Sequence, residues 1–231
     1  MTGDIAGNYR RVRAAIDAAA LASGRRADDV RLLPVTKTRP VAEIEQIIAL
    51  AGNRVGENKV QEMAAKAADL AMAVEWVLIG HLQRNKARQA ARVMTELQSL
   101  DSLRLAEALE RYFEESSATT RLPVLVEVNT SGEAAKWGVA PGDVASFTAG
   151  LAAFPHLEPR GLMTVAHPDP GRAEAGFRAL AGLRDRLRDR DGGGWDELSM
   201  GMSGDFGAAI RHGSTCVRIG TALFGPRITP A

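Results

Sequence analysis

Residues 32–37 read Leu-Leu-Pro-Val-Thr-Lys, a short apolar run that ends directly in Lys37. Such a run is typical of a buried strand. Lysine is uncommon in this chain: it supplies five of the 29 basic residues, and arginine supplies the rest. A lysine can lose its proton when it is desolvated, whereas an arginine cannot, so Lys37 suggests amine chemistry. The alternative is a strand-end lysine whose ammonium group simply reaches solvent.

The same unit, a short apolar strand with a polar end, repeats along the chain and alternates with amphipathic segments. The pattern predicts strands over 30–36, 53–57, 75–80, 96–100, 122–128, 160–163, 197–200 and 216–219. It predicts helices over 4–22, 40–51, 58–70, 84–93, 102–115, 141–154, 172–190 and 203–211, so that each strand but the last is followed by a helix. Strands that alternate with helices favour parallel pairing.

Eight such strands fit a closed barrel better than an open sheet. The alternative, an open doubly wound sheet, lacks the G-x-G-x-x-G pattern of a dinucleotide fold. We therefore predict an α/β protein with a single (β/α)8 TIM barrel and an extra N-terminal helix. No shift in composition marks a second domain, so residues 1–231 are expected to form one domain.

Bulk composition describes an ordinary globular chain, with 45% hydrophobic and 25% charged residues. The net charge of +1 favours neither nucleic acid nor an acidic membrane surface as a partner. The single cysteine, Cys216, cannot form an internal disulfide and fits a reducing compartment. There is no basic-then-apolar leader, and no apolar run approaches the roughly 20 residues that span a bilayer. We expect a cytoplasmic protein.

Polar residues gather where the predicted strands end. They are Lys37, Glu57, Asn58, His81, Asp101, Asn129, Thr164 and Ser203, together with Arg218 inside the last strand. In a parallel barrel these ends lie on one face, where barrel active sites form. Single members have simpler explanations: His81 could be a satisfied structural histidine, and Asp101-Ser102 could cap a helix.

The loops after the last two strands are rich in small residues. Met200-Gly201-Met202-Ser203-Gly204-Asp205 follows the seventh strand, and Gly220-Thr221-Ala222 follows the eighth. Small residues let backbone N–H groups approach an anion, and hydroxyl groups add donors, so this pair of loops suits a phosphate. Ser203 could instead be the N-cap of a helix. A lysine beside a phosphate site indicates a bound phosphorylated aldehyde, in either a Schiff-base aldolase or a pyridoxal 5'-phosphate (PLP) protein.

Several longer segments resemble one known family, the pyridoxal phosphate homeostasis proteins (YggS/PROSC, or PLP-binding proteins). The matching segments are LLPVTKTRP at 32–40, VGENKVQE at 55–62, WVLIGHLQRNK at 76–86, SLDSLRLAEAL at 99–109, VLVEVNTSGEAAKWGV at 124–139, GLMTVA at 161–166 and LSMGMSGDFGAAIRHGSTCVRIGTALFG at 198–225. They span nearly the whole chain in order. One departure is Thr36, where many relatives carry serine.

The resemblance implies a single barrel of the alanine racemase N-terminal type, with PLP held by Lys37 as an aldimine. It implies that Arg218 faces the pyridine nitrogen. It implies further PLP contacts from Asn58, His81, Met200, Ser203, Gly220 and Thr221, with Met163 beside the ring and Lys136 as a secondary contact. It assigns no catalytic residue and no metal ligand.

An arginine beside the ring nitrogen cannot share a proton with it, so the ring is a weak electron sink and transamination is disfavoured. Racemisation remains possible only with two bases. The only tyrosines, Tyr9 and Tyr112, are predicted at inward helix positions, and the chain ends about ten residues after the eighth strand. We therefore expect a monomeric PLP carrier or buffer in vitamin B6 homeostasis. PLP-dependent apoenzymes are possible partners. The alternatives are a barrel-only amino-acid racemase, an aldolase and a purely structural protein.

Overall fold

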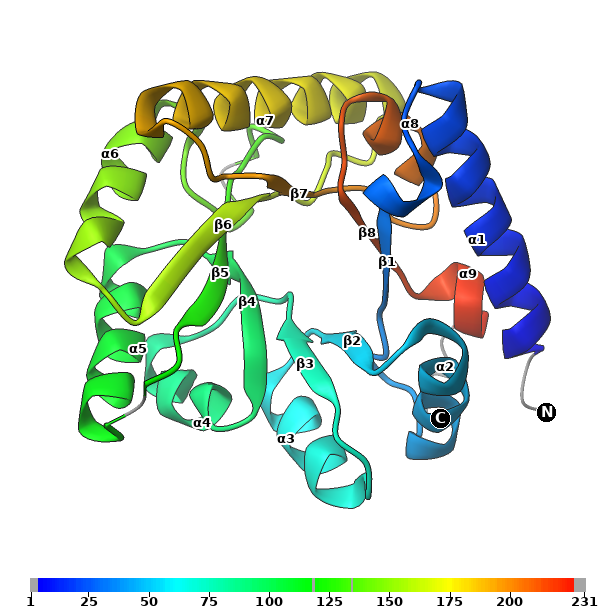
Figure 1. Cartoon of the computed structure of the whole chain (residues 1–231), viewed down its shortest axis with the longest axis horizontal. Coiled ribbons are helices and arrows are strands. Elements are labelled where there is room, and N and C mark those ends of the chain that lie inside the picture. Colours follow the sequence, from blue (N-terminus) through cyan, green and yellow to red (C-terminus); the bar gives the residue numbers. More distant parts are fainter. Residues whose placement is uncertain (1–3, 118, 134, 227–231) are drawn as a thin grey trace.

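Eight parallel strands form a barrel in the computed structural model, which describes residues 4–117, 119–133 and 135–226 (Figure 1). The strands are β1 (Arg31–Pro34), β2 (Arg54–Glu57), β3 (Glu75–Leu78), β4 (Met94–Leu100), β5 (Leu122–Glu127), β6 (Leu157–Met163), β7 (Glu197–Ser199) and β8 (Cys216–Ile219). Their order in the sheet is β1-β8-β7-β6-β5-β4-β3-β2, with every neighbouring pair parallel. The predicted fold class is confirmed.

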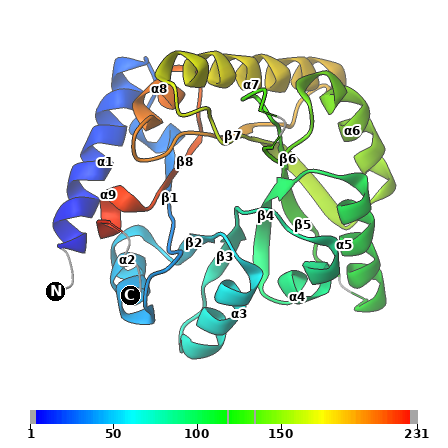
Figure 2. The same ribbon diagram turned by 180° about the vertical axis from the view of Figure 1, so that it is seen from behind.

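Helices surround the barrel on its outside (Figures 1 and 2). They are α1 (Ile5–Ala22), α2 (Val41–Ala51), α3 (Val60–Asp69), α4 (Ala87–Ala91), α5 (Leu103–Glu115), α6 (Val144–Gly150), α7 (Pro170–Asp191), α8 (Phe206–Arg211) and α9 (Thr221–Phe224). The additional N-terminal helix α1 packs against α2, α8 and α9, and so covers the junction between the first and last strands.

That junction closes the ring. β1 pairs with β8 in register, with Leu33 opposite Arg218 and Pro34 opposite Ile219. On its other side β1 meets β2 through one bridge between Val35 and Gly56, and the Thr36 N–H donates to the Gly56 carbonyl at 2.9 Å. Closure therefore puts the ends of the first and eighth strands side by side, although Pro34 and Ile219 are 185 positions apart in the sequence (219 minus 34).

Apolar side chains of the strands and helices form one large core, since a parallel sheet covered by helices is buried on both faces. The stripe predicted for α7 is confirmed, because Phe177, Leu180, Leu183 and Leu187 are all buried. In α1 the predicted residues Ile5, Val12 and Ile16 are buried as well, and Tyr9 is half-buried. No helix of the described part of the chain is long and apolar enough to cross a membrane.

Four local predictions need correction. The basic helix predicted over 84–93 is a 3-10 turn, Arg84–Lys86, followed by the five-residue α4. The helix predicted over 141–154 consists of α6 between two 3-10 turns. The helix predicted from Ser203 begins at Phe206. The eighth strand, predicted to lack a helix, leads directly into α9.

The late start of α8 has a local cause. The Met202 N–H donates to the Asp205 carboxylate at 2.5 Å, and Asp205 stands at the N-cap. A short aspartate that binds a neighbouring backbone N–H stabilises a turn in place of the first helical turn. Residues 202–205 therefore form a loop over the barrel mouth. Residues 1–3 and 227–231, which the predicted domain includes, lie outside the described residues.

Candidate functional site

A pocket of about 270 Å³ lies at the carboxyl ends of β1 and β8, beneath the loop that follows β7. Its lining residues are Val35, Lys37, Arg39, Ile79, Met202, Ser203, Gly204, Arg218, Gly220 and Thr221. Five of them were predicted from the sequence: Lys37, Ser203, Arg218, Gly220 and Thr221. The tertiary structure thus brings together the lysine, the arginine and both small-residue loops in one cavity.

Lys37 lies in a turn three residues after the end of β1 and is half-buried at the pocket. The backbone on either side of it is fixed by polar contacts. Thr36 is fully buried, and its hydroxyl donates to Glu57 at 2.7 Å. Thr38 has a positive φ of 65°, and its N–H donates to Glu62 at 2.5 Å. Because residues other than glycine rarely adopt this backbone conformation, the contact with Glu62 helps to stabilise the turn that carries Lys37.

Lys66 of α3 ties these contacts together. Its ammonium group donates to the Thr36 carbonyl at 2.7 Å, to Glu57 at 2.6 Å and to Glu62 at 2.7 Å. Glu57 is fully buried, and this burial raises the pKa of its carboxyl group although the hydrogen bonds from Lys66 and Thr36 lower it. Lys66 was not among the residues predicted from the sequence. The signal for it is the spacing of Glu62 and Lys66, four residues apart on one helix face.

Arg218 projects from β8 into the barrel and is almost completely buried. Its Nη1 donates to the Ser199 carbonyl at 2.7 Å and to the Ser199 hydroxyl at 2.8 Å, and its Nη2 donates to the Thr164 carbonyl at 2.8 Å. Burial lowers the pKa of the guanidinium, and nearby Glu127 and Asp205 act in the opposite direction. Three hydrogen bonds therefore fix the orientation of a buried cation at the floor of the pocket.

The two small-residue loops are joined by Ser203. Its hydroxyl accepts a hydrogen bond from the Ala222 N–H at 3.2 Å, so the loop after β7 is bonded to the first turn of α9. The alternative role as an N-cap of α8 is wrong, because Asp205 stands at that position. At Gly204 a Cβ atom would meet no other atom within 4 Å, so the space beside this backbone is open. We call Ser203, Gly204, Gly220 and Thr221 the cup.

Behind the cup, Arg39 holds the far end of α9. Its guanidinium donates to the carbonyl groups of Phe224 at 3.1 Å and Gly225 at 2.6 Å. Gly201, at the start of the loop after β7, has a φ of 95°, and a Cβ atom there would lie 2.6 Å from the Ala209 Cβ. Only glycine fits this position. Arg39 was not predicted, although it lies in the segment 32–40 that carries the lysine.

Five predicted contacts do not line this pocket: Met200, Asn58, His81, Lys136 and the fully buried Met163. Met200 is completely buried in the core, and Met202, two residues later, reaches the pocket in its place. Asn58 is exposed and packs against Gly80, where a Cβ atom would lie 2.2 Å from the Asn58 carbonyl oxygen. His81 belongs to a separate group on the mouth of the barrel.

That group, which we call the aromatic rim, consists of His81, Asp101 and Trp137. The His81 and Trp137 rings stack with their centroids 3.6 Å apart and their planes 8° from parallel. The Asp101 carboxylate lies 2.9 Å from His81 Nδ1. Lys136, next to Trp137, pairs with Glu133 at 2.6 Å and lines a separate cavity of about 200 Å³.

Glu127, at the end of β5, lines the same cavity as Lys136. It is 7% exposed, and its Oε2 has no hydrogen-bond partner among the described residues. Burial raises the pKa of Glu127 to about 7, with a further rise from Asp101 and an opposing effect of Arg218. Near neutral pH this side chain therefore exists in both protonation states.

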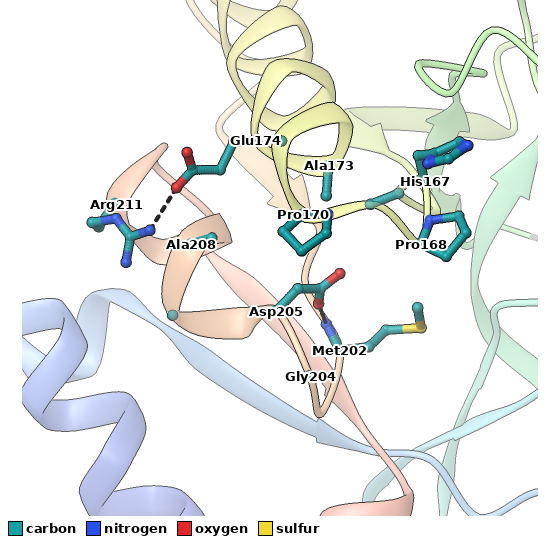
Figure 3. A pocket seen from close by; sticks show the side chains of 13 residues that line it. His167, Pro168, Pro170, Ala173, Glu174, Met202, Gly204, Asp205, Ala208 and Arg211 are labelled. Atoms are coloured by element: carbon teal, nitrogen blue, oxygen red, sulfur yellow. Dashed lines mark hydrogen bonds and ion pairs between the residues drawn. The ribbon is translucent and has the colours of Figure 1, made fainter.

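A larger pocket of about 740 Å³ adjoins the pocket of Lys37 and shares Met202 and Gly204 with it (Figure 3). The start of α7, with Pro170 and Ala173, forms one wall, and α8 forms the other. Glu174 and Arg211 form an ion pair of 2.6 Å across its rim. The cup is thus open on this side to a wide, mainly apolar hollow. No group of three or more metal-ligating side chains occurs among the described residues.

Comparison with known proteins shows which families this chain resembles. The family described as "Alanine racemase, N-terminal domain" matches residues 5–228. A pyridoxal phosphate homeostasis protein of Pseudomonas aeruginosa is 42% identical over 224 residues, which cover 96% of each chain. The structure of PipY of Synechococcus elongatus with PLP bound is 33% identical, with a TM-score of 0.77 over 91% of this chain and 99% of that one.

An alanine racemase of Clostridium difficile has the same fold at 14% identity, with a TM-score of 0.77 over 98% of this chain and 57% of that one. At this level of identity the likeness concerns the barrel alone.

Proposed function

The chain belongs to the alanine racemase N-terminal domain family and, within it, to the pyridoxal phosphate homeostasis proteins, and on this premise we propose that it binds PLP. The observation that carries the proposal is the convergence of Lys37, Arg218 and the cup on one pocket of about 270 Å³. PLP supplies an aldehyde that bonds covalently to a primary amine and a ring that can stabilise negative charge. All further roles belong to residues of this chain.

The donor set fits this cofactor at three points. Lys37 offers an amine at the pocket wall, at the end of a loop fixed by Lys66. The cup offers a hydroxyl group, small residues and the first turn of α9 to a phosphate group. Arg218 offers a buried cation that only donates hydrogen bonds, which suits an unprotonated ring nitrogen.

We propose that the protein carries or buffers PLP and has little or no turnover of its own. Among the ten described residues that line the pocket, Lys37 is the only one that can exchange a proton readily, since Arg39 and Arg218 stay protonated. Tyr9 and Tyr112 belong to the outer helices α1 and α5, and neither lines the pocket. Racemisation requires a base on each face of the substrate carbon, and this pocket offers one.

The proposal extends to the setting of the protein. Residues 1–231 form one cofactor-binding domain that acts as a monomer in the cytoplasm and maintains the supply of PLP. A free aldehyde reacts with many amines, so a carrier that delivers it to PLP-dependent apoenzymes has a physical purpose. Asn58, His81 and Met200 remain predicted contacts, which a change of loop conformation on binding would have to bring to the ring.

A visible absorption spectrum of the protein with PLP tests the proposal. Lys37→Ala should abolish the band of the lysine-bound cofactor, whereas Lys136→Ala should retain it. An unchanged spectrum in Lys37→Ala would assign the covalent bond to another lysine and contradict the proposed site. Exchange of an amino-acid α-proton with solvent deuterium at a substantial rate would favour the racemase alternative. Borohydride trapping of a sugar phosphate on Lys37, without PLP, would favour an aldolase.

A further inference from the structure

Beneath Arg218, inside the barrel, four polar side chains of β4, β7 and β8 form one hydrogen-bonded chain. Arg218 donates to the Ser199 hydroxyl at 2.8 Å, Ser199 donates to Gln98 Oε1 at 2.6 Å, and Gln98 Nε2 donates to Glu96 Oε1 at 2.6 Å. Gln98 and Ser199 are completely buried, and Glu96 is 2% exposed. Arg54 of β2 forms an ion pair with the other oxygen of Glu96. This row of hydrogen bonds therefore runs from the amino-terminal side of the barrel to the floor of the pocket.

The direction of each hydrogen bond is fixed by the chemistry of the two ends. Arg54 and Arg218 can only donate, so Glu96 and the Ser199 oxygen must accept from them. Glu96, held as an acceptor, must receive the amide N–H of Gln98, which turns the carbonyl oxygen of Gln98 towards Ser199. The Ser199 hydroxyl proton therefore points at Gln98, and a lone pair faces Arg218. A glutamine is suited to this place because it offers a donor and an acceptor at its two ends.

Two of the three bonds that orient Arg218 involve Ser199, so what fixes Ser199 also fixes the guanidinium. Nη2 carries two N–H groups, and one of them donates to the Thr164 carbonyl, so we assign the other as the donor to a ligand. A guanidinium that rotated by a few tens of degrees would misalign that donor. Hydrogen bonds weaken steeply with angle, so orientation at this point affects how strongly the ring is held.

We propose that Gln98 and Glu96 are positioning residues of the cofactor site. They hold the Ser199 hydroxyl in one orientation and thereby keep the Arg218 guanidinium aligned with the ring nitrogen. Neither residue lines the pocket, so both act through Arg218. This inference rests on the proposed binding of PLP. A simpler account is that Gln98 only fills the interior of the barrel, in which case an apolar side chain of similar size would serve as well.

Two substitutions of Gln98 separate these accounts. Gln98→Met removes both hydrogen bonds and keeps the length of the side chain. Gln98→Glu introduces a carboxyl group that, when protonated, offers one donor and one acceptor as the amide does. When ionised, it loses the donor and faces the carboxylate of Glu96. The protonated form should therefore restore the chain of hydrogen bonds, and the ionised form should break it.

Two quantities are measured for each variant and for the wild type: the dissociation constant for PLP and the position of the absorption band of the bound cofactor. Both are followed as a function of pH, and each variant is compared with the wild type at the same pH. Gln98→Met should weaken PLP binding about tenfold at every pH, as expected if the misaligned Arg218 loses about one hydrogen bond to the ring. It should also shift the absorption band. Gln98→Glu should match the wild type at the acidic end and weaken progressively as the pH rises. Ser199→Ala, a smaller change, should weaken binding about as much as Gln98→Met.

Thermal unfolding and circular dichroism of the cofactor-free proteins check that each variant folds. If Gln98→Met does not fold, the PLP affinity of Ser199→Ala tests the inference in its place. Wild-type affinity and an unshifted band in every folded variant at all pH values would overturn the inference while leaving PLP binding intact. Failure of the wild type itself to bind PLP would overturn the proposed function and this inference together.

Discussion

The cup and the aromatic rim both stand on the same face of the barrel, yet they differ in how their polar groups are used. In the cup, the Ser203 hydroxyl accepts a hydrogen bond from Ala222, and the backbone at Gly204 faces open space. In the rim, His81 stacks on Trp137 and pairs with Asp101. The cup therefore leaves open space beside its backbone, whereas the polar groups of the rim bind one another.

The difference follows from the order of the strands around the ring. β7, β8 and β1 are neighbours in the sheet, so the loops after them converge on Lys37. His81 follows β3, which lies on the other side of β2 from β1. A polar residue at the carboxyl end of any strand lies on the same face of the barrel. Whether it lines the pocket of Lys37 depends on whether its strand is next to β1 or β8 in the sheet.

The largest expected effect concerns the support of the lysine beside the cup. Lys66→Met leaves Glu57 buried without its ion pair, which should lower the free energy of unfolding by about 3–5 kcal/mol. It should also weaken PLP binding, because the turn that carries Lys37 loses a contact. Urea denaturation and PLP titration measure the two effects. Lys59→Met, at an exposed position before the same helix, should change stability by less than about 0.5 kcal/mol; equal effects of the two substitutions would contradict the role of Lys66.

A second effect, with a dependence on pH, comes from Glu127. Burial raises its pKa to about 7 in the folded protein from an ordinary value of 4.5. The folded state therefore holds this proton more tightly than the unfolded state, so the contribution of Glu127 to stability is fully present below pH 4.5 and is lost as the pH rises to 7. The loss amounts to about 3 kcal/mol at most.

Glu127→Gln should remove this dependence and make the protein more stable than the wild type above pH 7. Denaturation curves between pH 4.5 and 8 test this, with exposed Glu45→Gln as the matched control. A wild-type stability that rises through this range relative to Glu127→Gln would show that the carboxylate is stabilised in the fold, contrary to expectation.

Two glycines of the loop after β7 should separate folding from binding. Gly201→Ala meets both a positive φ and a Cβ contact of 2.6 Å, so it should lower stability by about 1–3 kcal/mol. Gly204→Ala meets no atom within 4 Å and should leave stability nearly unchanged. Because Gly204 lines the pocket of Lys37, the added methyl group should nevertheless weaken PLP binding several-fold. If Gly204→Ala binds PLP as tightly as the wild type, the phosphate does not lie in the cup.

The smallest effect is expected at the rim. Trp137 is 60% exposed and lies outside the pocket of Lys37, so Trp137→Ala should change stability by about 0.5 kcal/mol and PLP affinity by less than about twofold. Isothermal titration of PLP into both proteins checks this. A loss of affinity comparable to that of Gly204→Ala would show that the rim closes over the cofactor and would remove the contrast drawn between the two regions.

Much of the barrel could be predicted from local sequence. The inward stripe of α7, the apolar bodies of the strands and the polar strand ends all follow from periodicity, because each depends on residues close together in the chain. Element ends were less predictable. The helix after β7 starts at Phe206 because Asp205 binds the Met202 backbone, a competition between a turn and a helix that periodicity does not reveal.

For the site, the sequence by itself determined the chemical components: a rare lysine at a strand end, a buried arginine and two loops of small residues. Only the tertiary structure decided which of these components meet. Closure of the ring brings β8 against β1 and places Lys66 beneath the Lys37 turn, and it leaves His81 paired on the rim. The physical reason is that residue type and spacing act locally along the chain, whereas a pocket is made by contacts between segments far apart in sequence.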